Sequence, residues 1–177
     1  SLKFAGIENF TIVDGAVLYD SKPVDPYISR KLIEFYDAGL PYMPLVNFWK
    51  RLCMNPSKNS VHQLYRFLEA AKCPITEDGM IISVKGVLPH PSKPKTYISK
   101  HDRNFEYVLG VPCEMHRSQV ADTPATACGA GIHAGSVGYA RDWASGGGVV
   151  IELLIDPVDV VGPRPLDLAE LQEAQQL

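Results

Sequence analysis

The sequence has no excess of charge of either sign and no long apolar run, and each absence excludes a class of protein. Its 177 residues include 17 Lys and Arg against 20 Asp and Glu, a formal net charge of -3. Proteins that bind nucleic acid by neutralising phosphates usually carry a clear basic excess, so no specific nucleic-acid site is expected. The longest apolar stretch, Val149–Ile155, contains Glu152. It is far shorter than the roughly 20 residues of a membrane-spanning helix.

Cysteine is scarce, and an export signal is missing. Four cysteines are too few to form the disulfide framework of a chain this long. The N-terminal residues show no basic segment followed by an apolar one, so we expect a cytosolic protein with reduced thiols. These thiols are Cys53, Cys73, Cys113 and Cys128.

Apolar residues make up 46% of the chain, enough for one well-buried core. The hydrophobic period changes near residue 79, from helical spacing to strand-like runs. We therefore predict an α+β fold. An N-terminal subdomain (1–78), made of a β-hairpin and helices, is expected to pack on a β-rich subdomain (79–177), so that the two form one compact unit.

The N-terminal half predicts a hairpin followed by three amphipathic helices. Asp14-Gly15 separates two short β-prone runs, 10–13 and 16–19, which is a strong hairpin signal. Proline near a helix start and glycine or Asn-Pro at its end then delimit the helical stretches. The predicted starts are Pro26, Pro44 and either Ser57 or Asn59, and the predicted ends are Gly39, Asn55 and Pro74.

The C-terminal half predicts four strands and a short helix. Strands are expected at 80–85, 97–98, 107–109 and 149–155, and a helix at 135–143. The near-continuous apolar run at 149–155 predicts a strand buried on both faces. A further short helix is expected within 166–177.

The first candidate site is the glycine-rich segment 128–136, Cys-Gly-Ala-Gly-Ile-His-Ala-Gly-Ser. Glycine lets the backbone approach a ligand closely, and Ser136 is placed to cap the following helix. Backbone N–H groups at such a helix start bind anions such as phosphate. The alternative is an ordinary turn between a strand and a helix. Gly131, His133, Ser136 and the later Tyr139 are the predicted ligand-binding residues of this region.

Lys85 and Glu152 are the second candidate, because each interrupts an apolar strand pattern. One hypothesis is that Lys85, His133 and Glu152 converge at the rim of one cleft. His133 would then polarise or transfer a proton, and Glu152 would accept a hydrogen bond from a ribose or base. The alternative is that both charged residues lie on exposed edge strands, with Glu152 pointing to water.

A third, weaker candidate is a zinc site. Two cysteines and two histidines are chemically sufficient for tetrahedral zinc. The residues concerned are Cys113, His116, Cys128 and His133. Buried structural cysteines are the more common explanation, so no metal is expected.

Several segments, taken in order, resemble the rIIB-like proteins of tailed bacteriophages. The resemblance extends from about the hairpin to Val161, and the chain departs from the usual family pattern at His116, where proline is usual, and in its acidic, Gln-rich tail. The segments are 55–57, 67–69, 73–79, 84–87, 116–120, 128–136 with 139–140, and 157–161.

The resemblance implies a phage protein made in the host bacterial cytoplasm, acting in lysis control or in counter-defence. It also implies an rIIA-like protein partner or self-association, and peripheral association with the inner membrane. It supplies no catalytic residues.

The element order is also similar to that of ADP-ribosyltransferase-like folds. There an early basic strand residue, an aromatic residue and a late-strand glutamate surround NAD. The corresponding positions here are Lys85, Tyr139 and Glu152. Likeness of fold alone raises the expectation of a nucleotide-shaped cleft more than that of catalysis.

Three functions remain open from the sequence. The leading one is a non-enzymatic phage accessory protein that binds a partner or a nucleotide-like signal. The second is an ADP-ribosyltransferase-like or NAD-cleaving enzyme, with NAD as cofactor or substrate. The third is an assembly protein, whose sign would be an exposed apolar patch formed by Tyr42, Phe48 and Trp49.

Overall fold

The N-terminal hairpin forms as the Asp14-Gly15 turn predicts. The computed structural model describes residues 2–3, 9–71, 73–121 and 130–161. Strands β2 (Phe10–Val13) and β3 (Ala16–Tyr19) pair antiparallel, and β1 (Leu2–Lys3) and β4 (Lys22–Pro23) extend them to a four-stranded sheet. Asp14 and Gly15 have φ of 50° and 77°, the left-handed values that the tight turn requires.

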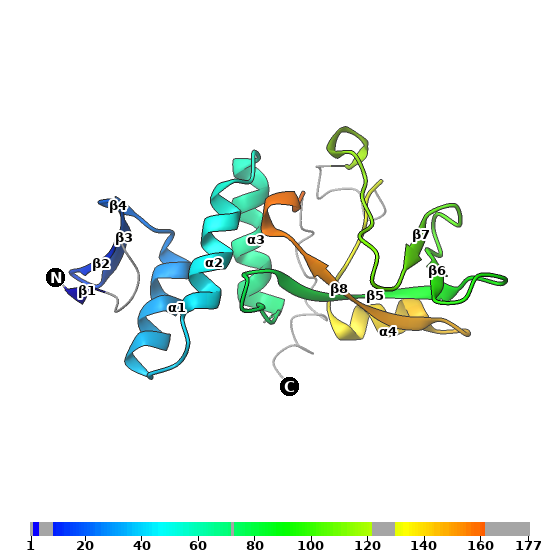
Figure 1. Ribbon diagram of the computed structural model, residues 1–177, viewed down its shortest axis with the longest axis horizontal. Helices are drawn as coiled ribbons and strands as arrows, with labels where there is room; N and C mark the ends of the chain where they lie inside the picture. The colour runs from blue at the N-terminus through cyan, green and yellow to red at the C-terminus, as the bar shows by residue number, and fades with distance from the viewer. Residues whose placement is uncertain (1, 4–8, 72, 122–129, 162–177) are drawn as a thin grey trace.

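Three helices follow, and all three predictions are confirmed. They are α1 (Pro26–Asp37), α2 (Met43–Cys53) and α3 (Lys58–Ala71). The Asp25 carboxylate caps α1 by accepting a hydrogen bond from the backbone N–H of Tyr27. The hydroxyl of Ser57 accepts from the backbone N–H of Ser60 at 3.2 Å, which identifies Ser57 as the cap of α3. Figure 1 shows these helices lying between the N-terminal sheet and a second sheet.

The main hydrophobic core joins the first sheet to the helices. Phe10, Ile28, Leu32 and Phe48 are fully buried there. The Trp49 ring packs edge-on against Phe10 and Tyr19, with centroid distances of 5.6 and 5.1 Å. The exposed apolar patch that would have indicated an assembly protein does not form, because Phe48 is fully buried and Tyr42 and Trp49 are half-buried against the core.

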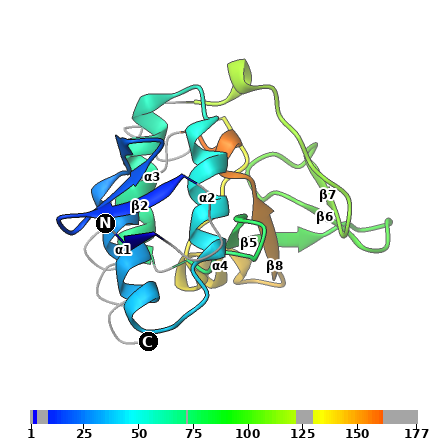
Figure 2. The same ribbon diagram turned by 60° about the vertical axis from the view of Figure 1, so that its left-hand side comes forward.

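The C-terminal half forms a second sheet in the order β7-β6-β5-β8. Its strands are β5 (Ile81–Pro89), β6 (Thr96–Ile98), β7 (Glu106–Val108) and β8 (Val149–Ile155). All neighbouring strands pair antiparallel, and the turned view of Figure 2 shows β6 and β7 at the end farthest from the helices. The α+β fold class is confirmed.

The prediction that β8 is buried on both faces is wrong. Val149, Val150 and Leu154 are 36%, 39% and 60% exposed. β8 ends the strand order of the sheet, and the exposed residues 150, 152 and 154 alternate along it with the more buried 151, 153 and 155, so only one face of the strand is covered. An apolar run cannot by itself distinguish a central strand from such an edge strand.

The predicted helix at 135–143 forms as α4 (Val137–Ala144). It packs on β5. Gly86 allows this contact. A methyl group there would meet the Ala140 carbonyl and lie 2.7 Å from the backbone nitrogen of Ala144. The remaining described helices are the short 3₁₀ segments η1 (Arg117–Gln119) and η2 (Pro157–Asp159).

Polar contacts join the two halves where β8 returns to the helices. The Arg51 guanidinium lies 2.5 Å from an Asp156 carboxylate oxygen and donates to the carbonyl of Asp78. The buried Asn55 amide donates to the carbonyls of Pro157 and Val160. The predicted helix within 166–177 lies outside the described residues. Within the ranges described, no helix combines the length and apolar character needed to cross a membrane.

Candidate functional site

A small cleft lies along the edge of β5 that faces away from β8. Residues of β5, of segments 99–101 and 133–135, and of α4 line it. Its cavity volume is only about 30 Å³, so the cleft is shallow and open to solvent. The lining residues are Val84, Lys85, Gly86, Ser99, Lys100, His101, His133, Ala134, Gly135, Tyr139 and Trp143.

Backbone hydrogen bonds hold the glycine-rich segment against β5. Gly135 donates to the Val84 carbonyl at 2.9 Å, and Val84 donates back at 3.4 Å. The Ser83 hydroxyl also donates to the Gly135 carbonyl, at 2.9 Å. Because β6 pairs only with the end of β5, at Leu88 and Pro89, the edge of β5 before it is left for the cleft.

Lys85 lines the cleft and is half-buried. Its ammonium donates to the His133 carbonyl at 2.9 Å and lies 5.6 Å from the centre of the Tyr107 ring. Burial lowers the pKa of Lys85, and the nearby Cys113 thiol partly offsets this effect. No ion pair to Lys85 occurs within the described part of the chain.

His133 lines the cleft, is exposed, and shares its surroundings with two other basic groups. Partial burial lowers the pKa of its imidazole, and the charges of Lys85 and His101 lower that pKa further. Lys100 adds a fourth basic side chain, whose ammonium donates to the Ser145 carbonyl at 2.7 Å. These groups would repel one another if all were charged.

Aromatic rings form the wall that α4 contributes. Tyr139 and Trp143 are four residues apart and therefore lie on one face of the helix, with ring centroids 6.0 Å apart. The His101 ring lies 4.5 Å from that of Trp143, at an interplanar angle of 53°. His101 is thus the residue that connects the basic and the aromatic parts of the cleft.

The chemistry of this lining suits an anion. Four basic side chains converge on the cleft, and among its described lining residues there is no carboxylate. Such an arrangement disfavours cations and stabilises negative charge, while the rings of Tyr139 and Trp143 offer apolar faces to a flat group.

The cleft contains some of the predicted ligand-binding residues and leaves out others. Lys85, His133 and Tyr139 line it, whereas Gly131 and Ser136 do not. Gly131 lies against Val120, and the Ser136 hydroxyl caps α4 by accepting from the backbone N–H of Tyr139 at 3.4 Å. The N–H of Gly135 is used by the bridge to β5, so it is not offered to a ligand.

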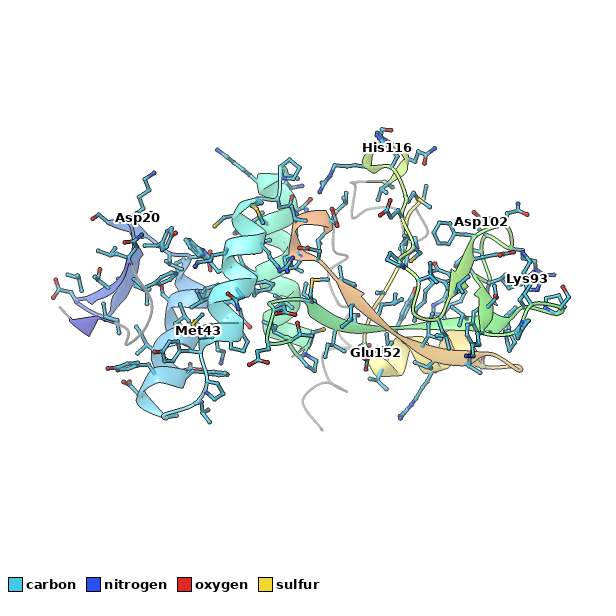
Figure 3. The ribbon with its side chains drawn as sticks, in the orientation of Figure 1. Asp20, Met43, Lys93, Asp102, His116 and Glu152 are labelled. Atoms are coloured by element: carbon cyan, nitrogen blue, oxygen red, sulfur yellow. The ribbon has the colours of Figure 1, made fainter. Side chains whose placement is uncertain are left out.

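The predicted convergence of Lys85, His133 and Glu152 is wrong for Glu152. Glu152 pairs with Val84 while Lys85 pairs with Ile151, so the two charged side chains point to opposite faces of the sheet. Glu152 is exposed on β8 (Figure 3) and is not among the residues that line the cleft. The alternative interpretation, an edge-strand glutamate facing water, describes its position.

The four predicted zinc ligands do not form a metal site in the described structure. Residues described here include no group of three or more His, Cys, Asp or Glu side chains that could hold a metal ion. His116 caps η1 through its ring nitrogen and is exposed, and Figure 3 labels it among the drawn side chains. Cys113 lies near Lys85, and burial raises the pKa of its thiol. Cys128 lies outside the described residues.

Sequence reasoning missed three of the lining residues, Lys100, His101 and Trp143. Lys100 and His101 lie in the loop after β6, and Trp143 lies on α4 one turn after Tyr139. No local pattern of residues marks these three positions as parts of one site. A long-range contact, between the loop after β6 and α4, brings them together.

The family model described as "Bacteriophage T4 protein rIIB" matches residues 5–170. The curated "Protein rIIB" of Enterobacteria phage T4 is 28% identical over 156 residues, which cover 88% of this chain and 48% of that protein. The chain thus spans about half the length of this relative. No solved structure matches the chain significantly.

Proposed function

Since the chain belongs to the rIIB family of bacteriophage proteins, we propose that it is a phage accessory protein that binds a small anionic, nucleotide-like molecule. The cleft between β5 and α4 is the proposed site. The protein would act in the host bacterial cytoplasm, in lysis control or in counter-defence, by sensing or sequestering such a signal.

One observation carries the binding proposal. Lys85, Lys100, His101 and His133 meet in one cleft whose described lining includes no acidic residue. The ammonium groups of Lys85 and Lys100 are each held by a backbone carbonyl, which leaves their charges uncompensated. The whole chain carries a net charge of -3, so this local excess of basic groups is a property of the cleft and not of the composition.

The proposal is one of binding and not of NAD cleavage. The carboxylate that the enzyme hypothesis requires, Glu152, projects from the opposite face of the sheet. An rIIA-like protein partner, self-association and peripheral association with the inner membrane stay predictions from the family resemblance.

Isothermal titration of the whole chain tests the binding proposal. Inorganic phosphate, adenosine monophosphate, ADP-ribose and NAD serve as probes. We expect at least one to bind in the micromolar range, and we expect Lys85→Gln to weaken that binding by about tenfold, as loss of a charge-assisted contact does. Lys50→Gln is the matched control, because Lys50 is exposed on α2 and the charge change is the same.

Two outcomes would contradict the binding proposal. One is the absence of heat with every probe at high micromolar concentration. The other is an equal loss of affinity in Lys50→Gln and Lys85→Gln, which would mean that net charge, and not the cleft, attracts the anion.

The biological role is tested in infected cells. A phage that carries Lys85→Gln in this chain is expected to show altered lysis timing, or reduced plating on hosts with defence systems, while Lys50→Gln behaves as the parent does. Unchanged lysis and plating with the Lys85 variant, at normal protein abundance, would exclude a role for the cleft in either process.

A further inference from the structure

We infer that the cleft recognises a mononucleotide through two contacts, a phosphate beside Lys85 and His133 and a flat base against Trp143 and Tyr139. This inference rests on the proposed function, because it specifies the ligand of the same site. It adds that neither inorganic phosphate nor a nucleoside alone would use the whole cleft.

The two kinds of contact come from different parts of the chain. Lys85 and His133 supply positive charge from β5 and the glycine-rich segment, and Lys85 is fixed by its bond to the His133 carbonyl. Tyr139 and Trp143 supply rings from α4. Bases stack on such rings with little dependence on their identity, since every base has a π-face.

His101 shows that one small ligand can reach both parts. Its ring lies 4.5 Å from the Trp143 ring, and both residues line the same cleft as Lys85 and His133. The basic and the aromatic parts therefore share one cleft, so a phosphate and a base joined by one sugar can contact both.

The size of the cleft sets the upper limit. The cavity volume, about 30 Å³, has room for roughly two water molecules and hence for one compact group such as a phosphate. It is far smaller than the roughly 300–1,000 Å³ of a closed ligand site, so the rest of a nucleotide would lie in the open mouth of the cleft. A dinucleotide would leave its second half in solvent.

Fluorescence of Trp143 provides a direct test. The chain has two tryptophans, and Trp49→Phe leaves Trp143, in the cleft, as the single reporter. Trp49 packs in the core against Phe10 and Tyr19, and phenylalanine keeps an aromatic ring there. This variant is titrated with adenosine monophosphate, adenosine, inorganic phosphate and NAD, with the cleft itself unchanged.

We expect adenosine monophosphate to change Trp143 emission and to bind about tenfold or more tightly than adenosine or inorganic phosphate. NAD should bind no more tightly than adenosine monophosphate. Inorganic phosphate binding as tightly as the nucleotide would overturn the mononucleotide inference but leave the anion-binding proposal standing. The inference would also be overturned if NAD bound tenfold more tightly than adenosine monophosphate, or if adenosine bound as tightly as adenosine monophosphate. If no probe bound, both the mononucleotide inference and the anion-binding proposal would be overturned.

A cleft variant separates the two contacts. Trp143→Leu keeps the β-carbon that packs near Gly86 but removes the ring. By calorimetry, we expect nucleotide affinity to fall about tenfold while inorganic phosphate affinity stays the same. Circular dichroism confirms folding of the variant, and a nucleotide affinity unchanged by the loss of the ring would contradict stacking.

Discussion

His133 is the residue whose protonation most directly links the cleft to pH. Partial burial and the charges of Lys85 and His101 lower its pKa in the free protein. A bound anion would stabilise the imidazolium and raise that pKa again. Binding then takes up a proton, so affinity should increase as the pH falls through the range in which His133 titrates.

We therefore predict stronger binding of adenosine monophosphate at pH 5.5 than at pH 7.5 relative to His133→Asn, which cannot become charged. The comparison with this variant cancels the titration of the phosphate itself, because the ligand is the same in both titrations. Calorimetry at both pH values gives the ratio of the affinity of the parent protein to that of His133→Asn. A ratio that does not change with pH would exclude His133 as the proton acceptor.

Residue-scale prediction from the sequence was partial. Lys85 interrupts the apolar pattern of its strand and His133 lies between glycines, so both could be identified as candidates. The position of Glu152 could not be predicted, because the register that pairs Val84 with Glu152 is a property of two distant strands. A shift of one residue would have turned Glu152 to the face of Lys85.

Among the elements, the contact between α4 and β5 positions the aromatic wall. Gly86 makes this contact close, since a β-carbon there would meet backbone atoms of Ala140 and Ala144, which cannot move independently of the helix. The position of α4, and with it of Trp143, thus depends on one residue of β5.

We predict that Gly86→Ala destabilises the protein by about 1–3 kcal/mol, the cost of overpacking a close contact. Gly135→Ala is the comparison, because its methyl group would meet only the Tyr139 ring, at 3.1 Å, and a side chain can shift. Chemical denaturation measures both free energies of unfolding. Equal losses in the two variants would contradict the special role assigned to Gly86.

Most of the elements could be predicted from local signals. The Asp14-Gly15 turn, the proline-started helices and the Ser136 cap are short-range features, and the structure confirms each. The edge position of β8 could not be predicted, because strand order depends on long-range pairing. For the same reason, the approach of His101 to Trp143 has no signal in the sequence.

At the scale of the whole molecule, the two halves share the main core, which includes Ile81 and Ile155 of the second sheet, and polar contacts between the helices and the segment after β8 add to this. Asn55 is 9% exposed, and its amide donates to the carbonyls of Pro157 and Val160. Arg51 adds its contacts with Asp156 and Asp78. Breaking such a buried contact leaves unsatisfied carbonyl groups behind.

We predict that Asn55→Ala lowers the free energy of unfolding by about 1–3 kcal/mol, since the buried carbonyl of Pro157 and the part-buried carbonyl of Val160 lose their donor. Asn47→Ala is the matched control, because Asn47 makes a single exposed hydrogen bond, to the Glu77 carbonyl, and should cost less than about 1 kcal/mol. Urea denaturation compares the two variants. An equal or smaller effect of the Asn55 variant would show that this contact does not hold the halves together.

Anion binding in the cleft between β5 and α4 is the central claim, and the five histidines of the chain provide a direct test. Two of them, His101 and His133, line the cleft, whereas His62, His90 and His116 lie outside it. Nuclear magnetic resonance spectra of the imidazole rings, recorded during titration with adenosine monophosphate, report on all five at once. We predict saturable shifts of His101 and His133 with the other three unchanged; no shifts, or equal shifts of all five, would contradict the claim.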